Sequence, residues 1–306
     1  MLEITNDMFK RIEDVKQTEI IARPSTSLIR DGWRRLKENK LAMIGLLVIL
    51  FMIFMALFGP YMLPYSYEGQ VLDDRNLGVS SEHWFGTDDL GRDMFVRCWY
   101  GARTSLLIGF IAAFIDLFIG VVYGGISGYS SRKVDQIMMR IIDVLYALPY
   151  LLVVILIMVV MDRQGIITIV IALAATGWVG MARLVRGQIL QLKEMEFVLA
   201  AKTLGASTKR LLAKHLIPNS SGPIIVNLTL TIPSAIFAEA FLSFIGLGVS
   251  PPKTSWGSLI NDGVGVMMSG YWWRLIFPAM LISLTMFAFN VFGDGLRDAL
   301  DPKLRK

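Results

Sequence analysis

The sequence predicts an all-α integral membrane protein with six transmembrane helices. Of its 306 residues, 54% are hydrophobic, and the mean hydropathy is +0.56. Soluble domains contain roughly 45–50% apolar residues. The apolar residues gather in long runs, and a helix needs about 20 of them to cross the hydrocarbon of a bilayer. The first 40 residues are charged and polar and hold no apolar signal-peptide core, so we expect the first span to direct insertion.

Six apolar runs are long enough, or nearly so, to span the membrane. They are Leu41–Leu63, Thr104–Gly125, Ile137–Met161, Ile166–Ala182, Ile224–Leu247 and Leu275–Phe292. The fourth run is short, and Arg183 and Arg186 can extend it by reaching the headgroups. The chain then divides into five parts: an N-terminal tail (1–40), a first span (41–63), a long loop (64–103), a core of five further spans (104–296, with a polar loop at 190–219) and a C-terminal tail (297–306).

The basic residues predict the orientation of these spans. Nine Lys or Arg lie in residues 1–40, two at Arg132 and Lys133, seven between Arg183 and Lys214, and four between Arg297 and Lys306. Seven lie on the opposite side of the predicted membrane. Because cytoplasmic loops carry the excess of Lys and Arg, we expect both termini and the 190–219 loop in the cytoplasm, and the 64–103 loop outside.

The polar loop from Glu196 to Pro218 interrupts the apolar runs with two short amphipathic segments. Phe197, Ala200, Ala201 and Leu204 follow a spacing that places them on one face of a helix. Gly205 suits a helix end because glycine tolerates positive φ.

A second helix is predicted to begin after Gly205 and to stop at Pro218. Its apolar face carries Leu211, Leu212, His215 and Leu216, and its basic face carries Lys209, Arg210 and Lys214. Two interpretations of the whole loop stand open at this point. It either docks on a partner protein or lies on the anionic inner surface of the membrane.

The order of residues in this loop resembles the EAA loop of ATP-binding-cassette (ABC) importer permeases. That pattern runs Glu-Ala-Ala, three residues, Gly, nine residues, Ile, one residue and Leu-Pro. Ala200, Ala201, Gly205 and Pro218 match it. Three positions depart from the pattern. Leu199 precedes the alanine pair, and the acidic residue, Glu196, comes three residues before it; His215 stands in place of Ile, and Ile217 in place of Leu. This arrangement resembles the variant found in peptide importers.

Three further segments resemble the C-type membrane subunit of oligopeptide and dipeptide ABC importers. They are HWFGTDDLGRDMFVRCWYGAR (83–103), LSFIGLGVSPPKTSW (242–256) and GDGLRDALDPKLRK (293–306). From the residues alone, Asp88, Asp89 and Asp93 suggest turn caps and ion pairs with Arg92 and Arg97; a cation site is the weaker alternative.

The resemblance implies a type I ABC importer permease that moves oligopeptides or dipeptides. The implied partners are a homologous second permease, two cytoplasmic ATPase subunits and an extracytoplasmic peptide-binding protein. It also implies that the loop docks on an ATPase through Glu196, Phe197, Ala200, Ala201, Leu204 and Gly205. Nickel or another small solute is the alternative cargo.

Two acidic residues within the spans are candidates for a translocation path or a subunit interface. They are Asp116 and Glu239, and such residues usually face a cavity or a partner because uncompensated charge in the membrane is costly. Arg140 and Asp143, three residues apart, are expected to pair. A proton-driven secondary transporter using such residues is a second functional class, but it favours inverted repeats, which the sequence does not show.

Several classes of function are excluded by missing motifs. The sequence contains no GxxxxGK[ST], HExxH or GxSxG motif, so we expect no catalytic residues, no metal site and no cofactor, with ATP and Mg²⁺ held by the partner ATPases. The single cysteine, Cys98, excludes an internal disulfide, and no aromatic-basic pattern suggests nucleic acid. We expect a multi-pass protein of the cell (cytoplasmic or inner) membrane.

Overall fold

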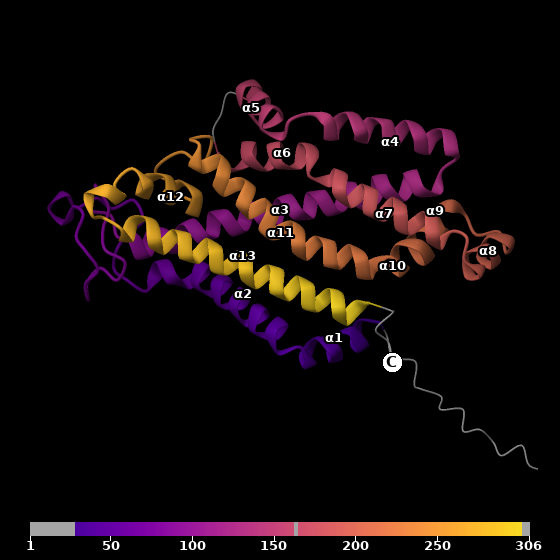
Figure 1. Ribbon diagram of the computed structural model, residues 1–306, viewed down its shortest axis with the longest axis horizontal. Coiled ribbons are helices and arrows are strands. Elements are labelled where there is room, and N and C mark those ends of the chain that lie inside the picture. The colour runs from indigo at the N-terminus through magenta and orange to yellow at the C-terminus, as the bar shows by residue number, and fades with distance from the viewer. Residues whose placement is uncertain (1–27, 162–164, 302–306) are drawn as a thin grey trace, which may run out of the picture.

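The computed structural model describes residues 28–161 and 165–301 as an elongated bundle of helices (Figure 1). The tail predictions for residues 1–27 and 302–306 lie outside the described residues. Within the described ranges, five helical segments are long and apolar enough to cross a membrane, and a bent pair of helices makes up to six. The only β-type pairing recorded there is an isolated bridge between Thr87 and Asp93.

The first span is α2 (Lys40–Phe58), continued by the short turn η2 (Gly59–Tyr61). It is preceded by α1 (Leu28–Glu38), which lies within the predicted N-terminal tail. The Asn39 side chain caps α2 by accepting from the Ala42 N–H. Buried Leu36 and Ala42 pack with Ala299 near the end of the last helix, so the end of the predicted tail is part of the bundle.

The second span, α3 (Met94–Tyr129), begins ten residues before the predicted Thr104 and shortens the predicted 64–103 loop. Asp93 caps it by accepting from the Val96 N–H at 2.9 Å. Arg97 and Arg103 lowered the hydropathy that defined the prediction, yet both fit in the helix. Arg103 donates to the Ala56 carbonyl and, at 2.6 Å, to that of Leu57, both in the last turn of α2.

The third span was predicted as one helix and is instead two helices bent by 87°. They are α4 (Arg132–Ala147) and α5 (Tyr150–Met161). Pro149 explains the break, because the residue before a proline is forced out of the helical region, and Leu148 has the extended angles φ −75° and ψ 131°.

The fourth span, α6 (Ile166–Thr176) with α7 (Trp178–Leu192), runs ten residues past the predicted end at Ala182. Arg183 and Arg186 do not simply extend toward headgroups. Arg183 pairs with Asp143 at 3.0 Å, and Arg186 pairs with Asp135, so both attach α7 to α4. The predicted pairing of Asp143 with Arg140 is therefore replaced by a pairing between helices.

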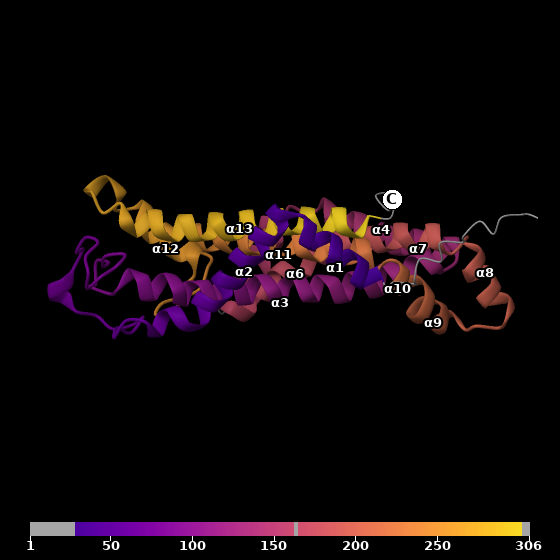
Figure 2. The same cartoon turned by 90° about the horizontal axis from the view of Figure 1, so that it is seen from below.

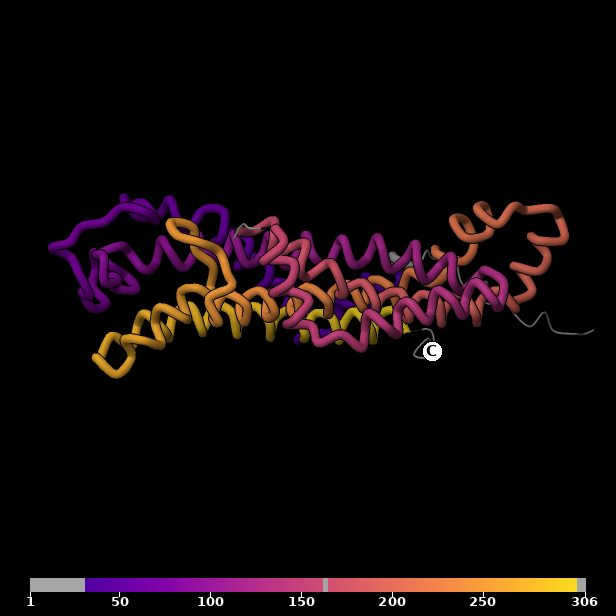
Figure 3. Tube along the Cα trace, turned by 90° about the horizontal axis from the view of Figure 1, so that it is seen from above, coloured from indigo at the N-terminus to yellow at the C-terminus, as the bar shows by residue number. Residues whose placement is uncertain are grey.

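The last two spans are α11 (Ser221–Phe244) and α13 (Trp273–Leu300), with α12 (Trp256–Val264) between them. Short turns η3 (Leu72–Asp74) and η5 (Met267–Ser269) lie in the connecting segments. Segment 62–93 and α12 gather at one end of the bundle (Figures 1 and 3). The 193–220 loop, α1 and the end of α13 lie toward the opposite end, and the two short helices of the loop extend past the bundle (Figure 2).

A row of glycines allows α3 to pack closely along α7. Gly120, Gly124 and Gly128 recur every four residues, the small-residue spacing that lets helix backbones approach in membranes. A Cβ at Gly120 would lie 2.5 Å from Met181 Cβ, and one at Gly128 would lie 2.9 Å from Ile189 Cβ. A Cβ at Gly124 would collide with the Ala182 carbonyl oxygen. We call this row the glycine seam.

Neighbouring glycines offer a direct test of the seam. Gly124→Ala places a methyl group against the α7 backbone and should lower the free energy of unfolding by about 1–3 kcal/mol. Gly125→Ala is the matched control, because its Cβ would meet only Leu212 Cδ2, at 3.9 Å. Thermal unfolding of the detergent-purified protein measures both. Equal melting temperatures for the two variants would contradict close packing at the seam.

Candidate functional site

The 193–220 loop folds as the predicted pair of short helical segments. The first is α8 (Glu196–Thr203), and the second comprises α9 (Thr208–Leu211), a π-helical turn (Leu212–Leu216) and α10 (Ile217–Asn219). Gly205 between them has φ +82°, as its position suggested. Ser207 begins the second segment by accepting from the Arg210 N–H.

The π-helical turn lies just before Pro218, and the geometry of proline explains this position. Proline has no N–H, and its ring clashes with the carbonyl four residues earlier in a regular helix. The widened turn removes this conflict, since the Ile217 N–H donates to the carbonyl of Leu212, five residues back. The loop thereby rejoins α11 without a break in the chain of helices.

One side of α8 is anchored in the protein and the other is open. Val198 is 2% exposed and packs in a cluster with Leu211 and Leu216 of the loop and Val185 and Ile189 of α7. Ala201 lies against the same cluster. Ala201, one of the four residues predicted to form a single docking face, therefore lies on the anchored side.

The other residues predicted to dock lie on the open side of the loop. Leu204 is 88% exposed, Phe197 is 44% exposed, and Glu196, Ala200 and Gly205 are exposed as well. An 88% exposed leucine next to an exposed phenylalanine is an apolar surface that a partner or a membrane would cover. No residue of the described chain covers this surface.

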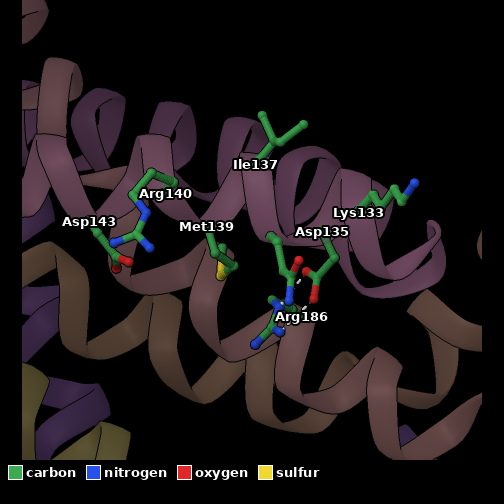
Figure 4. Close-up of a pocket in the computed structure, with 8 residues that line it drawn as sticks. Lys133, Asp135, Ile137, Met139, Arg140, Asp143 and Arg186 are labelled. Carbon is green, nitrogen blue, oxygen red and sulfur yellow. Dashed lines mark hydrogen bonds and ion pairs between the residues drawn. The ribbon is translucent and has the colours of Figure 1, made fainter.

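A groove of about 690 Å³ between α4 and α7 holds a second group of charged residues (Figure 4). Asp135 accepts two hydrogen bonds from Arg186, both at 2.6 Å, and a third from Ser127 at 2.6 Å. A bidentate guanidinium pair is among the stronger polar contacts in proteins. It joins α4 to α7 beside the glycine seam, on the loop side of the bundle.

Asp116 lies in a cavity of about 350 Å³ among α3, α5, α6 and α11. The carboxylate contacts Gly177, where a side chain would collide with it. It is 6% exposed, and its Oδ1 atom has no hydrogen-bond partner. Tyr150, whose hydroxyl is also buried without a partner, lines the same cavity. The sequence pointed to Asp116 but gave no reason to associate it with Tyr150.

Glu239 occupies a different environment and is 0% exposed. Its carboxylate accepts from Ser105 of α3 at 2.8 Å and from Ser243 of α11 at 2.7 Å. Ser105 also accepts from the Trp256 N–H at the start of α12. Glu239 thus stands at the junction of three helices, where its hydrogen bonds link α3, α11 and, through Ser105, α12.

The aspartates of segment 88–93 form ion pairs and caps, as the residues suggested. Asp88 pairs with Arg92 at 2.7 Å and with Arg97 at 3.5 Å, and Asp89 pairs with Arg274 at 3.0 Å. Within the described ranges, no group of three or more metal-binding side chains occurs.

A carboxyl group of α12 lies near the same arginines. Burial raises the pKa of Asp262, and Arg97, Arg274 and Arg92 oppose that rise. Arg92, Arg97 and Asp262 also line a cavity of about 200 Å³ at this end of the bundle.

Sequence comparison places the chain in a known class of membrane protein. Residues 120–306 match the family described as the inner membrane component of binding-protein-dependent transport systems, and residues 27–78 match the N-terminal transmembrane domain of oligopeptide transport permease C. The chain belongs to this permease family, and the matches place it in the C-type branch. The expected family is therefore confirmed.

Curated relatives agree with this assignment, and a solved structure shares the fold. The chain is 60% identical over 294 residues to the dipeptide transport system permease protein DppC of Bacillus subtilis, covering 96% of this chain and 92% of the relative. It is 54% identical to the oligopeptide transport system permease protein OppC of the same organism over the full length of both. The MetNI methionine ABC transporter shares the fold, with a TM-score of 0.53, 16% identity, and coverage of 66% of this chain and 94% of that one.

The difference in exposure across α8 predicts the labelling of two cysteine variants. In inside-out vesicles that lack partner subunits, Leu204→Cys should react with a membrane-impermeant maleimide about tenfold faster than Val198→Cys. The native Cys98 is buried, which keeps the background low. In intact cells neither variant should react, because the loop is predicted to be cytoplasmic. Labelling of Leu204→Cys from outside would contradict that orientation.

Proposed function

We propose that this chain is the C-type membrane permease of an ABC importer for dipeptides or oligopeptides. The match along the full length to a relative named for oligopeptide transport, and the 60% identity to one named for dipeptide transport, support this cargo over nickel or another small solute. The open apolar surface of α8, which carries the family's loop pattern, is the observation that supports an external energy source.

In this proposal the loop is the contact with a cytoplasmic ATPase. Phe197, Ala200 and Leu204 form the docking surface, and Gly205 permits the turn that presents it. Ala201 contributes from the edge, where it also packs on the protein's own core. Glu196 in the first turn of α8 is placed to interact with a basic group or with the helix N-terminus.

The anchored side of α8 provides a path for force into the membrane helices. Val198 shares one hydrophobic cluster with Val185 and Ile189 of α7 and with Ile224 of α11. A displacement of α8 by the ATPases therefore has to move α7 and α11 or break this cluster. We propose that the displacement switches the spans between inward-open and outward-open states.

The remaining parts of the assembly follow from the same assignment. The chain is a multi-pass protein of the inner membrane, with both termini and the loop proposed to be cytoplasmic because of the basic residues around them. We propose a homologous second permease, two ATPase subunits that hold the ATP and Mg²⁺, and an extracytoplasmic peptide-binding protein. The chain itself needs no cofactor in this scheme.

The two buried carboxylates have different proposed roles. Asp116 faces a cavity and is proposed to lie on the translocation path. The enclosed network around Glu239 favours a positioning role within the bundle over contact with cargo.

Reconstitution in liposomes with the partner subunits tests the function. Uptake of a labelled peptide should require ATP, the ATPases and the binding protein. Uptake driven by a pH gradient without ATPase subunits would contradict the proposal and favour a secondary transporter.

Substitution of Gly205 tests the docking surface. Gly205→Asp adds charge and bulk to the turn and should weaken ATPase association by about tenfold or more, because an unpaired charge in an interface is costly. Insertion and association with the second permease should persist. Gly270→Asp is the matched control: it has φ +90° and, like Gly205, open space around it, but it lies at the opposite end of the bundle.

Co-purification of the ATPase subunits and peptide uptake are the two measurements. Gly270→Asp should retain the ATPases, whereas Gly205→Asp should lose them together with ATP-driven uptake. Normal uptake by Gly205→Asp would argue that the loop merely lies on the membrane surface.

A further inference from the structure

The cavity around Asp116 contains polar groups from three helices, α3, α5 and α11. Its polar lining consists of Asp116 on α3, Tyr150 at the start of α5, and Asn227, Thr231 and Ser234 on α11. Ser234 is exposed, so the cavity opens at the surface of the chain beside it. A volume of about 350 Å³ falls within the range of small-ligand sites, roughly 300–1,000 Å³.

The Asp116 carboxylate has no compensating charge within the described chain. Its Oδ1 atom is buried without a hydrogen-bond partner, and no Lys, Arg or His lines the cavity. An ionised carboxylate in a membrane span is costly unless a cation or hydrogen-bond donors compensate it. Gly177 has no side chain, and the Asp116 carboxylate occupies the space where its Cβ would lie. A cation with hydrogen-bond donors that enters the cavity would compensate the carboxylate.

The hydroxyl groups beside Asp116 favour a donor-rich cation. Thr231 Oγ1 donates to the Asn227 carbonyl at 2.9 Å, and Ser234 Oγ donates to the Leu230 carbonyl at 3.0 Å. Since each hydroxyl has one hydrogen, both oxygens offer only lone pairs to the cavity. Together with the carboxylate they form a set of acceptors, while the Asn227 amide and the Tyr150 hydroxyl bring donors to the same lining. A primary ammonium group, with three N–H donors and no acceptor, complements such a set.

We infer that Asp116 binds the terminal ammonium group of a peptide during its passage through the membrane. The Thr231 oxygen accepts from the same group, and the free hydroxyl of Tyr150 donates to a carbonyl of the peptide. This assignment rests on the proposed function and adds to it a residue that contacts the cargo. A basic side chain of the second permease is the competing occupant, and the experiment separates the two.

The test measures protection of a cysteine at the mouth of the cavity. Ser234→Cys is introduced into the assembled complex with the second permease and ATPases, without the binding protein, and its rate of labelling by a thiol reagent is followed. Alanyl-alanine at about four times its dissociation constant should slow labelling about fivefold. Propionyl-alanine, which lacks only the amino group, should give less than about twofold protection at the same concentration.

Asp116→Asn in the same background separates binding from structure. It should abolish the difference between the two peptides while the second permease still co-purifies. Asp262→Asn, which alters an exposed carboxyl of α12 outside this cavity, is the control and should preserve the difference. Equal protection by both peptides with Asp116 present, or an unchanged difference in Asp116→Asn, would overturn the inference.

Loss of the second permease from Asp116→Asn would also overturn it, by assigning the carboxylate to the subunit interface. ATP-dependent uptake of alanyl-alanine by the wild-type complex, with its binding protein added, is measured in parallel. If the wild type imports no peptide, the proposed function itself fails. If it imports peptide while the cysteine results contradict the inference, only the role of Asp116 fails.

Discussion

The close packing of α3 against α7 is the constraint on which the rest of the structure depends. In a bilayer no hydrophobic force drives helices together, so the association relies on close contact and on polar links. The glycine seam supplies the contact, and Asp135 with Arg186 supplies a polar link to α4 at the same place. The contacts of α7 with α3 extend from Gly177, beside Asp116, to Ile189, beside Gly128. The cavity and the loop are therefore connected by one helix held against another.

In the proposed function, this arrangement is the path by which movement of the loop reaches the cavity. Val198 fixes α8 to the loop end of α7, and Phe197 and Leu204 remain free for a partner. The 87° bend after α4 leaves α5 as a separate unit that brings Tyr150 to the cavity. At the far end, the hydrogen bonds of Glu239 join α3, α11 and α12. A movement of α8 would thus be transmitted through the close contacts of the glycine seam, and the bend between α4 and α5 would let α5 move separately near the cavity.

Most of the helices were predictable from the sequence because apolar length is a strong signal. Its failures have identifiable causes. Arg97 and Arg103 hid the first turns of α3, since hydropathy cannot register ion pairs or carbonyl acceptors supplied by other segments. Apolar length missed the bend at Pro149, because a proline interrupts a helix without ending the apolar run. In the loop, spacing predicted both helices but assigned Ala201 wholly to the docking face, because helical periodicity alone does not reveal which side packs on α7. The four-residue spacing of Gly120, Gly124 and Gly128 is visible in the sequence and was missed. The shared cavity of Asp116 and Tyr150 could not be predicted, because it depends on how α3 and α5 pack.

The central claim is that α8 docks on an ATPase while its other side is fixed to α7. A photo-activatable cross-linker attached at Leu204 in the assembled complex tests this most directly, with one at Phe118, an exposed residue of α3, as the reference. The account predicts that Leu204 forms adducts with an ATPase subunit and that Phe118 does not. Adducts of Leu204 with lipid alone, in a complex that imports peptide, would contradict it.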